Sequence, residues 1–295
     1  MTRRKRNQPP LLLLDTFSVK DLTRWDAFKE KILRYHWDLY SALAYERRKI
    51  ADQIQLALLE AATNRYEFTA WQRQVRYKYS LSPLSPKGSL IEPGGRFNIP
   101  VINPDQISPF PALYIAEDKE TTMQEAGQQH TDNPELSPLD LALTRKDSIS
   151  IISVSGKLTS IIDLQQPDKL KPFLDLIKGF AVPKSILRTA KKIGVDDPST
   201  VQNMNALIES LLEPNWRAMF MQLDVPANCQ IFGQLVANAG IGGILYPSKF
   251  TKKKCLAIFP QNLESEDFVV VDGDTPAGTI SRLDSATWMA VKATL

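Results

Sequence analysis

Arg96 stands directly behind two glycines in the stretch GGRFN (94–98). Glycine reaches backbone conformations that are closed to other residues and lets a ligand or a second chain approach closely. Further along, the stretch PALYIAEDKETTMQEA (111–126) places Tyr114 and Glu125 eleven residues apart. A charge held behind two glycines is more often presented to a ligand than packed. Arg96, Tyr114 and Glu125 are therefore the first residues to examine for chemistry.

The remaining reactive residues exclude several common mechanisms. His36 and His130 are far apart in sequence, and Cys229 and Cys255 stand unpaired in apolar contexts, so we expect no metal site. The sequence contains no P-loop motif and no G-x-S-x-G nucleophile motif, and GIGG (240–243) lacks the Rossmann glycine spacing. Any catalysis must rest on Arg, Glu, Ser, Tyr or Asp.

Length and composition set the class of protein. The chain has 295 residues, of which 43% are hydrophobic, enough for one large domain or two ordinary ones. No apolar run approaches the roughly 18 to 20 residues that cross a bilayer, so we expect no membrane segment. The four leucines at 11–14 are too few for the core of a secretory signal. We expect a basic N-terminal tail and a cytoplasmic protein.

The N-terminal part is basic and helical in pattern. Residues 1–80 contain sixteen Lys or Arg against nine Asp or Glu, and the rest of the chain has twenty against twenty-four. Such an excess could bind nucleic acid or an acidic partner, or it could be a solvated helical surface. Apolar residues recur at spacings of three and four from Trp25 to Leu59, which predicts one long helix or a helical hairpin over about 20–62. His36 lies on this stripe and is expected to be packed. We assign residues 1–70 to a basic helical region.

The rest of the chain alternates short strands with helices. Asp118 is the expected cap of a helix that starts after the apolar strand ALYIA. The segment 167–222 is expected to be mostly helical. This pattern predicts a mixed α+β domain over residues 71–295. The further strands are expected at the start of 75–89 and at 148–156, 161–164, 242–248, 253–260 and 268–273.

Taken together in their order, these motifs resemble the RES domain family, bacterial toxin-type proteins named for an arginine, a glutamate and a serine. The glycine-flanked Arg96, Tyr114 of the LY-x-A strand and Glu125 of the next helix match the family pattern. Ser248 matches its late Pro-Ser turn, and an upstream Arg-Tyr pair fits residues 76–77. The resemblance spans about residues 72–262.

The resemblance implies a fold, a substrate and a set of site residues. The family is similar to ADP-ribosyltransferases, with a core of two small β-sheets around an NAD-binding cleft and flanking helices. Residues 1–70 would then be an N-terminal helical extension. NAD+ would be the substrate, with no separate cofactor. The implied catalytic residues are Glu125, Arg96 and Ser248, and the implied NAD-binding residues are Arg76, Tyr77, Arg96, Tyr114 and Ser248.

The chemistry of these residue types is compatible with that substrate. Arginine binds pyrophosphate well because its planar fork makes two charge-assisted bonds. Nicotinamide leaves NAD+ as a neutral amine, and the ribose left behind develops positive charge. A carboxylate such as Glu125 would stabilise that charge, Tyr114 or Tyr77 could stack on the nicotinamide, and Ser248 could orient Glu125. Taken singly, each residue has an ordinary alternative role in packing, a turn or the solvated surface.

Three functions remain open at this point. The first is a toxin that hydrolyses or phosphorolyses NAD+, in its own cell or in a target cell if it is delivered as an effector. The second is a protein mono-ADP-ribosyltransferase, and the third is an inactive module that binds nucleic acid or a partner. Nucleic acid is not expected to be the direct target of an active enzyme. Such a toxin needs an inhibitory antitoxin or immunity protein, and a homo-oligomer is left open.

Overall fold

The computed structural model describes residues 19–102, 105–127, 149–195, 198, 200–293 and 295. The basic tail and His130 lie outside these residues. The chain divides into two compact units, residues 1–44 with 182–199 and residues 45–181 with 200–295. Among the helices described, none is both long and apolar enough to cross a membrane.

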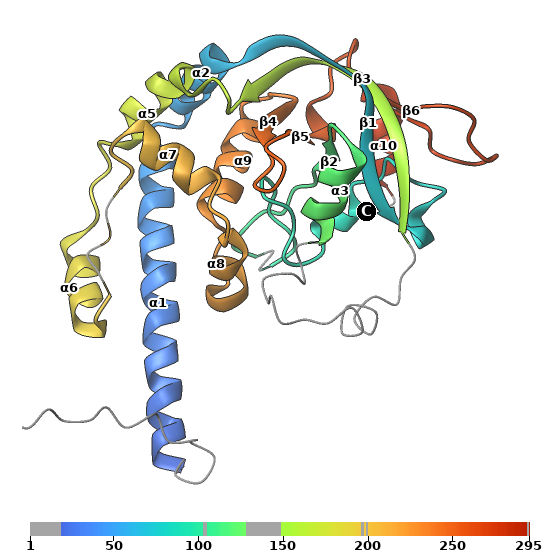
Figure 1. Ribbon diagram of the computed structural model, residues 1–295. Coiled ribbons are helices and arrows are strands. Elements are labelled where there is room, and N and C mark those ends of the chain that lie inside the picture. Colours follow the sequence, from blue (N-terminus) through green and yellow to red (C-terminus); the bar gives the residue numbers. More distant parts are fainter. Residues whose placement is uncertain (1–18, 103–104, 128–148, 196–197, 199, 294) are drawn as a thin grey trace, which may run out of the picture. The chain divides into compact units, whose positions relative to one another are not determined.

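Figure 1 shows the helices and strands in chain order. The helices are α1 (Val19–Lys49), α2 (Ala51–Ala61), α3 (Lys119–Gly127), α5 (Lys171–Ile177), α6 (Lys184–Ile193), α7 (Met204–Leu211), α8 (Trp216–Leu223), α9 (Asn228–Asn238) and α10 (Ser285–Lys292). The strands are β1 (Thr63–Arg76), β2 (Leu113–Ala116), β3 (Ile149–Asp163), β4 (Gly243–Pro247), β5 (Lys254–Ile258), β6 (Phe268–Val271) and β7 (Arg282–Asp284).

The smaller unit contains most of α1 and all of α6. Tyr35 of α1 packs in one buried cluster with Ile186 and Ala190 of α6. His36 meets the ring of Tyr35 edge to face at 4.9 Å, and burial lowers the pKa of His36, as expected for a packed histidine. The helical pattern predicted over 20–62 corresponds to two helices, α1 and α2.

The seven strands of the described residues belong to one sheet, in the order β1-β2-β5-β4-β3-β6-β7. β1 also pairs with β3, so the first five strands of this order close into a ring. β3 and β4 are parallel, and the other pairs are antiparallel. The mixed α+β class is confirmed, whereas the prediction of two small sheets is wrong because the long strand β3 pairs with β1, β4 and β6.

The long strands β1 and β3 run side by side in Figure 1, paired from Thr63 opposite Ile161 to Arg76 opposite Ile149. The strand expected to begin near residue 75 therefore ends there, and β1 starts before residue 70, the expected end of the helical region. The strands expected at 148–156 and 161–164 are one strand. The register shifts between 68 and 71, where Ala70 has φ 58°, and this bulge interrupts the two-residue alternation that marks a strand in sequence.

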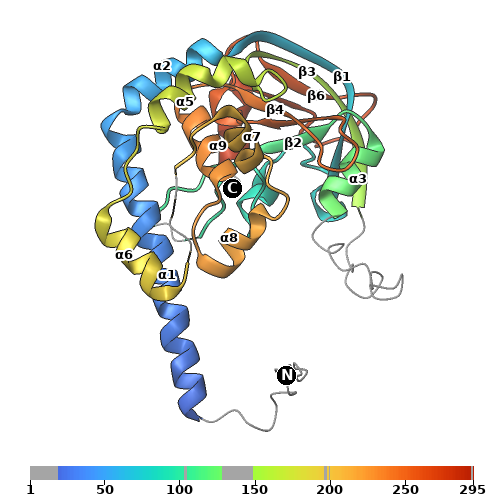
Figure 2. The same cartoon turned by 60° about the vertical axis from the view of Figure 1, so that its left-hand side comes forward.

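Side-chain alternation gives the sheet two apolar faces. In β2, Leu113 and Ile115 join one buried cluster and Tyr114 packs against the other. In β5, Leu256 belongs to the first cluster and Cys255 to the second. Helix α10 contributes to the first cluster. Helices α2, α5, α7 and α9 cover the second face, as Figures 1 and 2 show.

Candidate active site

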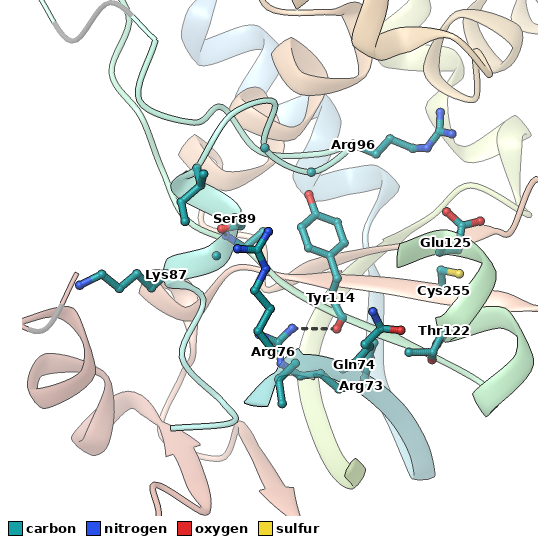
Figure 3. Close-up of a pocket in the computed structure, with 18 of the residues that line it drawn as sticks. Arg73, Gln74, Arg76, Lys87, Ser89, Arg96, Tyr114, Thr122, Glu125 and Cys255 are labelled. Carbon is teal, nitrogen blue, oxygen red and sulfur yellow. Dashed lines mark hydrogen bonds between the residues drawn. The ribbon is translucent and has the colours of Figure 1, made fainter. Parts of the chain in front are cut away.

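A pocket of about 340 Å³ lies within the larger unit. Its wall is built from the end of β1, the segment 85–96, β2, α3, the start of α8, β4 and β5. Four of the residues singled out from sequence line it: Arg76, Arg96, Tyr114 and Glu125. Figure 3 shows Arg96 and Glu125 on neighbouring parts of the wall, with Tyr114 between the strands and the Arg96 loop.

Glu125 is oriented by a short hydrogen bond. The hydroxyl of Ser248, a residue 1% exposed, donates to Glu125 Oε1 at 2.6 Å. The same Ser248 oxygen accepts from the backbone N–H groups of Phe250 at 3.2 Å and Thr251 at 3.5 Å. Because those bonds use the oxygen as an acceptor, the hydroxyl proton is directed to the carboxylate, and bonds of this charge-assisted kind are short and strong. Ser248 is not among the lining residues and meets the pocket through Glu125.

Two further links hold the same side of α3 to the turn between β4 and β5. Asp118 forms an ion pair with Lys253, and the Thr121 and Thr251 hydroxyls lie 2.7 Å apart. Positions 118, 121 and 125 are spaced as i, i+3 and i+7, which places them on one face of a helix. Glu125 is thus the last of three residues that tie α3 to one turn.

The predicted helix cap at Asp118 is confirmed. Its Oδ1 accepts from the backbone N–H of Thr121 at 2.8 Å, which satisfies one free donor of the first turn. The hydrogen bond from Lys253, together with that N–H, lowers the pKa of Asp118 to about 2. Asp118 is therefore charged throughout the neutral range and keeps α3 anchored.

The Arg96 loop is shaped by its two glycines. Gly94 has φ +77°, a left-handed conformation that favours glycine. A Cβ atom on Gly95 would lie 2.2 Å from Cζ of Tyr114, so the loop can approach the tyrosine ring only without a side chain there. Asn98, fully buried, accepts from the Gly95 N–H and from the Tyr114 hydroxyl, each at 2.9 Å. The opening motif is a tightly packed turn that presents Arg96.

Arg96 is buried, with 7% of its surface exposed, and is held by backbone oxygens. Its Nη1 donates to the carbonyl of Glu213 at 2.9 Å and to that of Leu211 at 3.4 Å. Leu211 is the last residue of α7, where the helix dipole favours a cation. The guanidinium carbon also lies 5.9 Å from the ring centroid of Trp216. The charge is fixed in place at the pocket wall.

Tyr114 has a defined structural contact in addition to lining the pocket. Its hydroxyl accepts from the Phe97 N–H at 2.9 Å while donating to Asn98. Burial raises the pKa of Tyr114 far above its usual value, so the phenol is neutral and remains a donor. The ring therefore supports the Arg96 loop, and stacking on a ligand remains a prediction.

The structure separates the predicted pair Arg76 and Tyr77. Arg76 ends β1 and reaches into the pocket, as Figure 3 shows. Tyr77 begins a 3-10 turn, is 66% exposed and is not among the lining residues. Tyr79, from the same turn, lines the pocket instead. The alternation of side chains along a strand does not predict the 3-10 turn that follows β1.

Several lining residues were not assigned to the site from sequence. Arg73 donates to three backbone oxygens, those of Pro83, Ser85 and Tyr114, at 2.8 to 3.0 Å. Burial lowers its pKa to about 10, so it stays charged at neutral pH. No local motif marks this role.

Helix α8 supplies two more. Trp216 and Arg217 both line the pocket, and Trp216 is 3% exposed. The Arg217 guanidinium lies 4.6 Å from the Trp216 ring.

Cys255 lines the pocket near Glu125, as Figure 3 shows, and burial raises the pKa of its side chain, so it is a thiol and not a thiolate nucleophile. Within the described residues, no group of three His, Cys, Asp or Glu could hold a metal ion.

The family model of the RES domain matches residues 69–279. The chain belongs to the RES domain family. Among solved structures, this RES domain protein is similar to a chain of the M. tuberculosis MbcT-MbcA toxin-antitoxin complex, at 14% identity and a TM-score of 0.42. That match covers 82% of this chain and 97% of the other. No curated protein matches the chain.

Proposed function

We propose that this RES domain protein is a toxin that cleaves NAD+ at the bond between nicotinamide and ribose, by hydrolysis or phosphorolysis. The main observation in support is the position of the Glu125 carboxylate on the wall of a pocket that is otherwise rich in cations. The Ser248 hydroxyl orients this carboxylate by a hydrogen bond to Oε1 at 2.6 Å. Family membership supports the same conclusion, because RES proteins are toxin-type enzymes that act on NAD+. Depletion of NAD would then stop the metabolism of the cell that contains the enzyme.

The charges that line the pocket favour an anionic ligand. NAD+ carries two phosphate groups, and arginine binds them with two parallel charge-assisted bonds. A volume of about 340 Å³ is within the range of small-molecule sites. The lining cations are Arg73, Arg76, Lys87, Arg96 and Arg217, against the carboxylates of Glu92 and Glu125.

The proposed reaction needs one negative charge near the ribose. When the glycosidic bond breaks, its electron pair leaves with nicotinamide, which departs as a neutral molecule, and positive charge develops on the ribose. Glu125 would stabilise that charge and orient the attacking oxygen of water or phosphate. With water, the products are nicotinamide, ADP-ribose and a proton. Because Ser248 binds Oε1, the second carboxylate oxygen is the one we expect to face the ribose.

The test is nicotinamide release from NAD+ by the purified protein, with and without inorganic phosphate, for wild type, Arg96→Ala and Glu125→Ala. We expect turnover by wild type and a loss of about 100-fold or more in both variants. Free ADP-ribose would identify hydrolysis, and phosphorylated ADP-ribose would identify phosphorolysis. Label that moves from NAD+ onto protein would favour the transferase. An inert wild type, or variants as active as wild type, would refute the assignment of this site.

We also propose an inhibitory protein partner. An enzyme that consumes NAD+ in the cytoplasm would poison the cell that makes it unless an antitoxin or immunity protein restrains it. The toxicity that makes such a partner necessary is tested by growth after induction of the wild-type gene and of Glu125→Ala. Arrest by wild type alone, relieved by nicotinamide riboside or another NAD precursor, is the expected result. Equal growth of both strains would contradict a toxin that acts through this site.

A further inference from the structure

The loop 93–98, which carries Arg96, is packed between β2 and helix α9. On one side Gly95 faces the ring of Tyr114, with no room for a side chain. On the other side Gly233 of α9 faces the loop, where a Cβ atom would lie 2.1 Å from the carbonyl oxygen of Phe97. Helix α9 therefore approaches the loop backbone directly.

Gln230, one turn before Gly233 on α9, is fully buried and binds the same loop. Its Nε2 donates to the backbone oxygens of Pro93 at 3.1 Å, Gly95 at 3.3 Å and Asn98 at 3.1 Å. Its Oε1 accepts from the N–H of Ala227 at 3.1 Å, which also caps α9. Every polar atom of this side chain is thus in use.

The three carbonyls bound by Gln230 flank Arg96 on both sides. Buried backbone oxygens must find a donor, because leaving one unsatisfied is costly. The loop brings its own amide, Asn98, whose Nδ2 donates to the oxygens of Ser89 at 2.7 Å and Phe110 at 3.2 Å. Asn98 therefore closes the loop on the β2 side, and Gln230 is the donor that α9 supplies on the other.

We propose that Gln230 is a positioning residue that fixes the Arg96 loop and so aims the Arg96 guanidinium at the pocket. Gln230 does not line the pocket, so it acts through Arg96 and not on the ligand. The effect on turnover rests on the proposed function. The effect on the loop does not, because it concerns only hydrogen bonds within the chain.

The first experiment is hydrogen exchange of the loop in the full-length protein carrying Gln230→Met. The amides of Gly94, Gly95 and Phe97 are all hydrogen-bonded within this region, so their exchange reports the order of the loop. We expect exchange in 94–98 to accelerate about tenfold or more, with β4 and β5 unchanged. The control is Gln234→Met, a half-buried glutamine on the same helix, which should leave loop exchange as in wild type. Unchanged loop exchange in Gln230→Met would overturn the proposal.

The second experiment is a double-mutant cycle between Gln230→Met and Arg96→Ala, read as kcat/KM for NAD+. If Gln230 acts through Arg96, Gln230→Met lowers kcat/KM about tenfold or more in wild type and changes little in the Arg96→Ala background. Full additivity of the two losses would refute action through Arg96. Run well below the melting temperature of every variant, the kinetic cycle separates positioning from simple destabilisation.

A second variant keeps both tests decisive if Gln230→Met fails to fold. Gln230→Glu retains the acceptor for Ala227 N–H and, when the buried carboxyl is protonated, offers one O–H donor in place of two N–H donors, so helix capping is preserved while the loop loses part of its bonding. The same loop exchange and kinetic cycle are expected. If wild type does not cleave NAD+, the proposed function fails, and the exchange experiment alone decides the role of Gln230.

Discussion

The two sides of the pocket hold their charged residues by different means. On the Glu125 side, formed by α3 and the turn 248–253, side chains bind side chains: Asp118 to Lys253, Thr121 to Thr251 and Glu125 to Ser248. The Arg96 side is formed by loop 93–98, α7, α8 and α9. Here the guanidinium of Arg96 and the buried amide of Gln230 donate hydrogen bonds to backbone oxygens.

The difference is one of solvent and charge. The side chains of Lys253 and Asp118 are 51% and 30% exposed, whereas Asn98 and Gln230 are fully buried. Ion pairs near solvent respond to salt and pH, and neutral buried amides do not titrate. Single polar substitutions on the Glu125 side should therefore change stability by small amounts that depend on salt and pH. On the Arg96 side, substitutions that change side-chain volume should destabilise the fold.

The largest expected effect comes from Glu125→Gln. Glutamine keeps an acceptor for Ser248 but removes the negative charge, so turnover of NAD+ should fall about 100-fold to 10,000-fold while thermal stability changes little. The control is Glu120→Gln, an exposed position on the same helix that does not line the pocket. Nicotinamide release and a thermal melt measure both effects. A Glu125→Gln variant with near wild-type turnover would remove the carboxylate from the mechanism.

The next effect tests the packing of the Arg96 side. Gly95→Ala would place a methyl group 2.2 Å from the Tyr114 ring, and overpacking of this kind costs about 1–3 kcal/mol in the free energy of unfolding. Gly88→Ala is the matched control, because no atom lies within 4 Å of its added Cβ. That variant should be neutral or stabilised by less than about 1 kcal/mol. Urea unfolding measures both, and equal midpoints would contradict the tight loop.

Sequence reasoning worked best where structure is local. The strands β2, β4, β5 and β6 are short apolar runs bounded by turns, and each was expected within a few residues of its place. The helix after β2 and its cap at Asp118 follow from a local signal as well. Glu125 and Arg96 line one pocket, as their motifs suggested, although their catalytic roles stay predictions.

Contacts between distant parts of the chain could not be predicted from the sequence. Gln230 binds a loop more than 130 residues away, and nothing in its neighbourhood marks it as different from Gln234. The 14-residue strand β1 was predicted only at its end, because the bulge interrupts the alternation of its side chains and many of its residues also favour helices. The sequence alone does not place Trp216 beside Arg96, because the two residues are 120 positions apart and only the folded chain brings them together. These features depend on tertiary pairing, which a single sequence encodes weakly.

A smaller effect is expected at the middle link of the Glu125 side. Thr121→Val removes the hydroxyl that meets Thr251 and keeps the shape of the side chain, so the free energy of unfolding should fall by about 1 kcal/mol. Turnover should fall only a few-fold, because the Ser248 bond remains. The comparison is the double variant with Thr251→Val: a coupling energy of about 0.5–1.5 kcal/mol confirms a direct bond. Fully additive losses would place the two hydroxyls apart in solution.

The smallest effect concerns the pH dependence of the Asp118–Lys253 pair. The pKa of Asp118 in the folded chain, about 2, lies below its ordinary value of 3.8, so the folded state favours the charged form. The resulting stability is fully present above pH 3.8 and is lost as the pH falls through about 2. Asparagine caps helices as well as aspartate, so Asp118→Asn removes the charge and keeps the cap.

Because Lys253 is half exposed, the Asp118→Asn variant should lose no more than about 1 kcal/mol at neutral pH, and less in high salt. The difference from wild type should shrink as the pH falls from 4 towards 2. The control is Asp284→Asn, since Asp284 caps α10, pairs with Arg282 and also has a pKa of about 2. Both variants should show the same pH window in urea unfolding, but only Asp118→Asn should also slow NAD+ cleavage, because α10 carries no residue of the pocket. A loss of turnover in both variants, or in neither, would mean that the anchoring of α3 does not govern the position of Glu125.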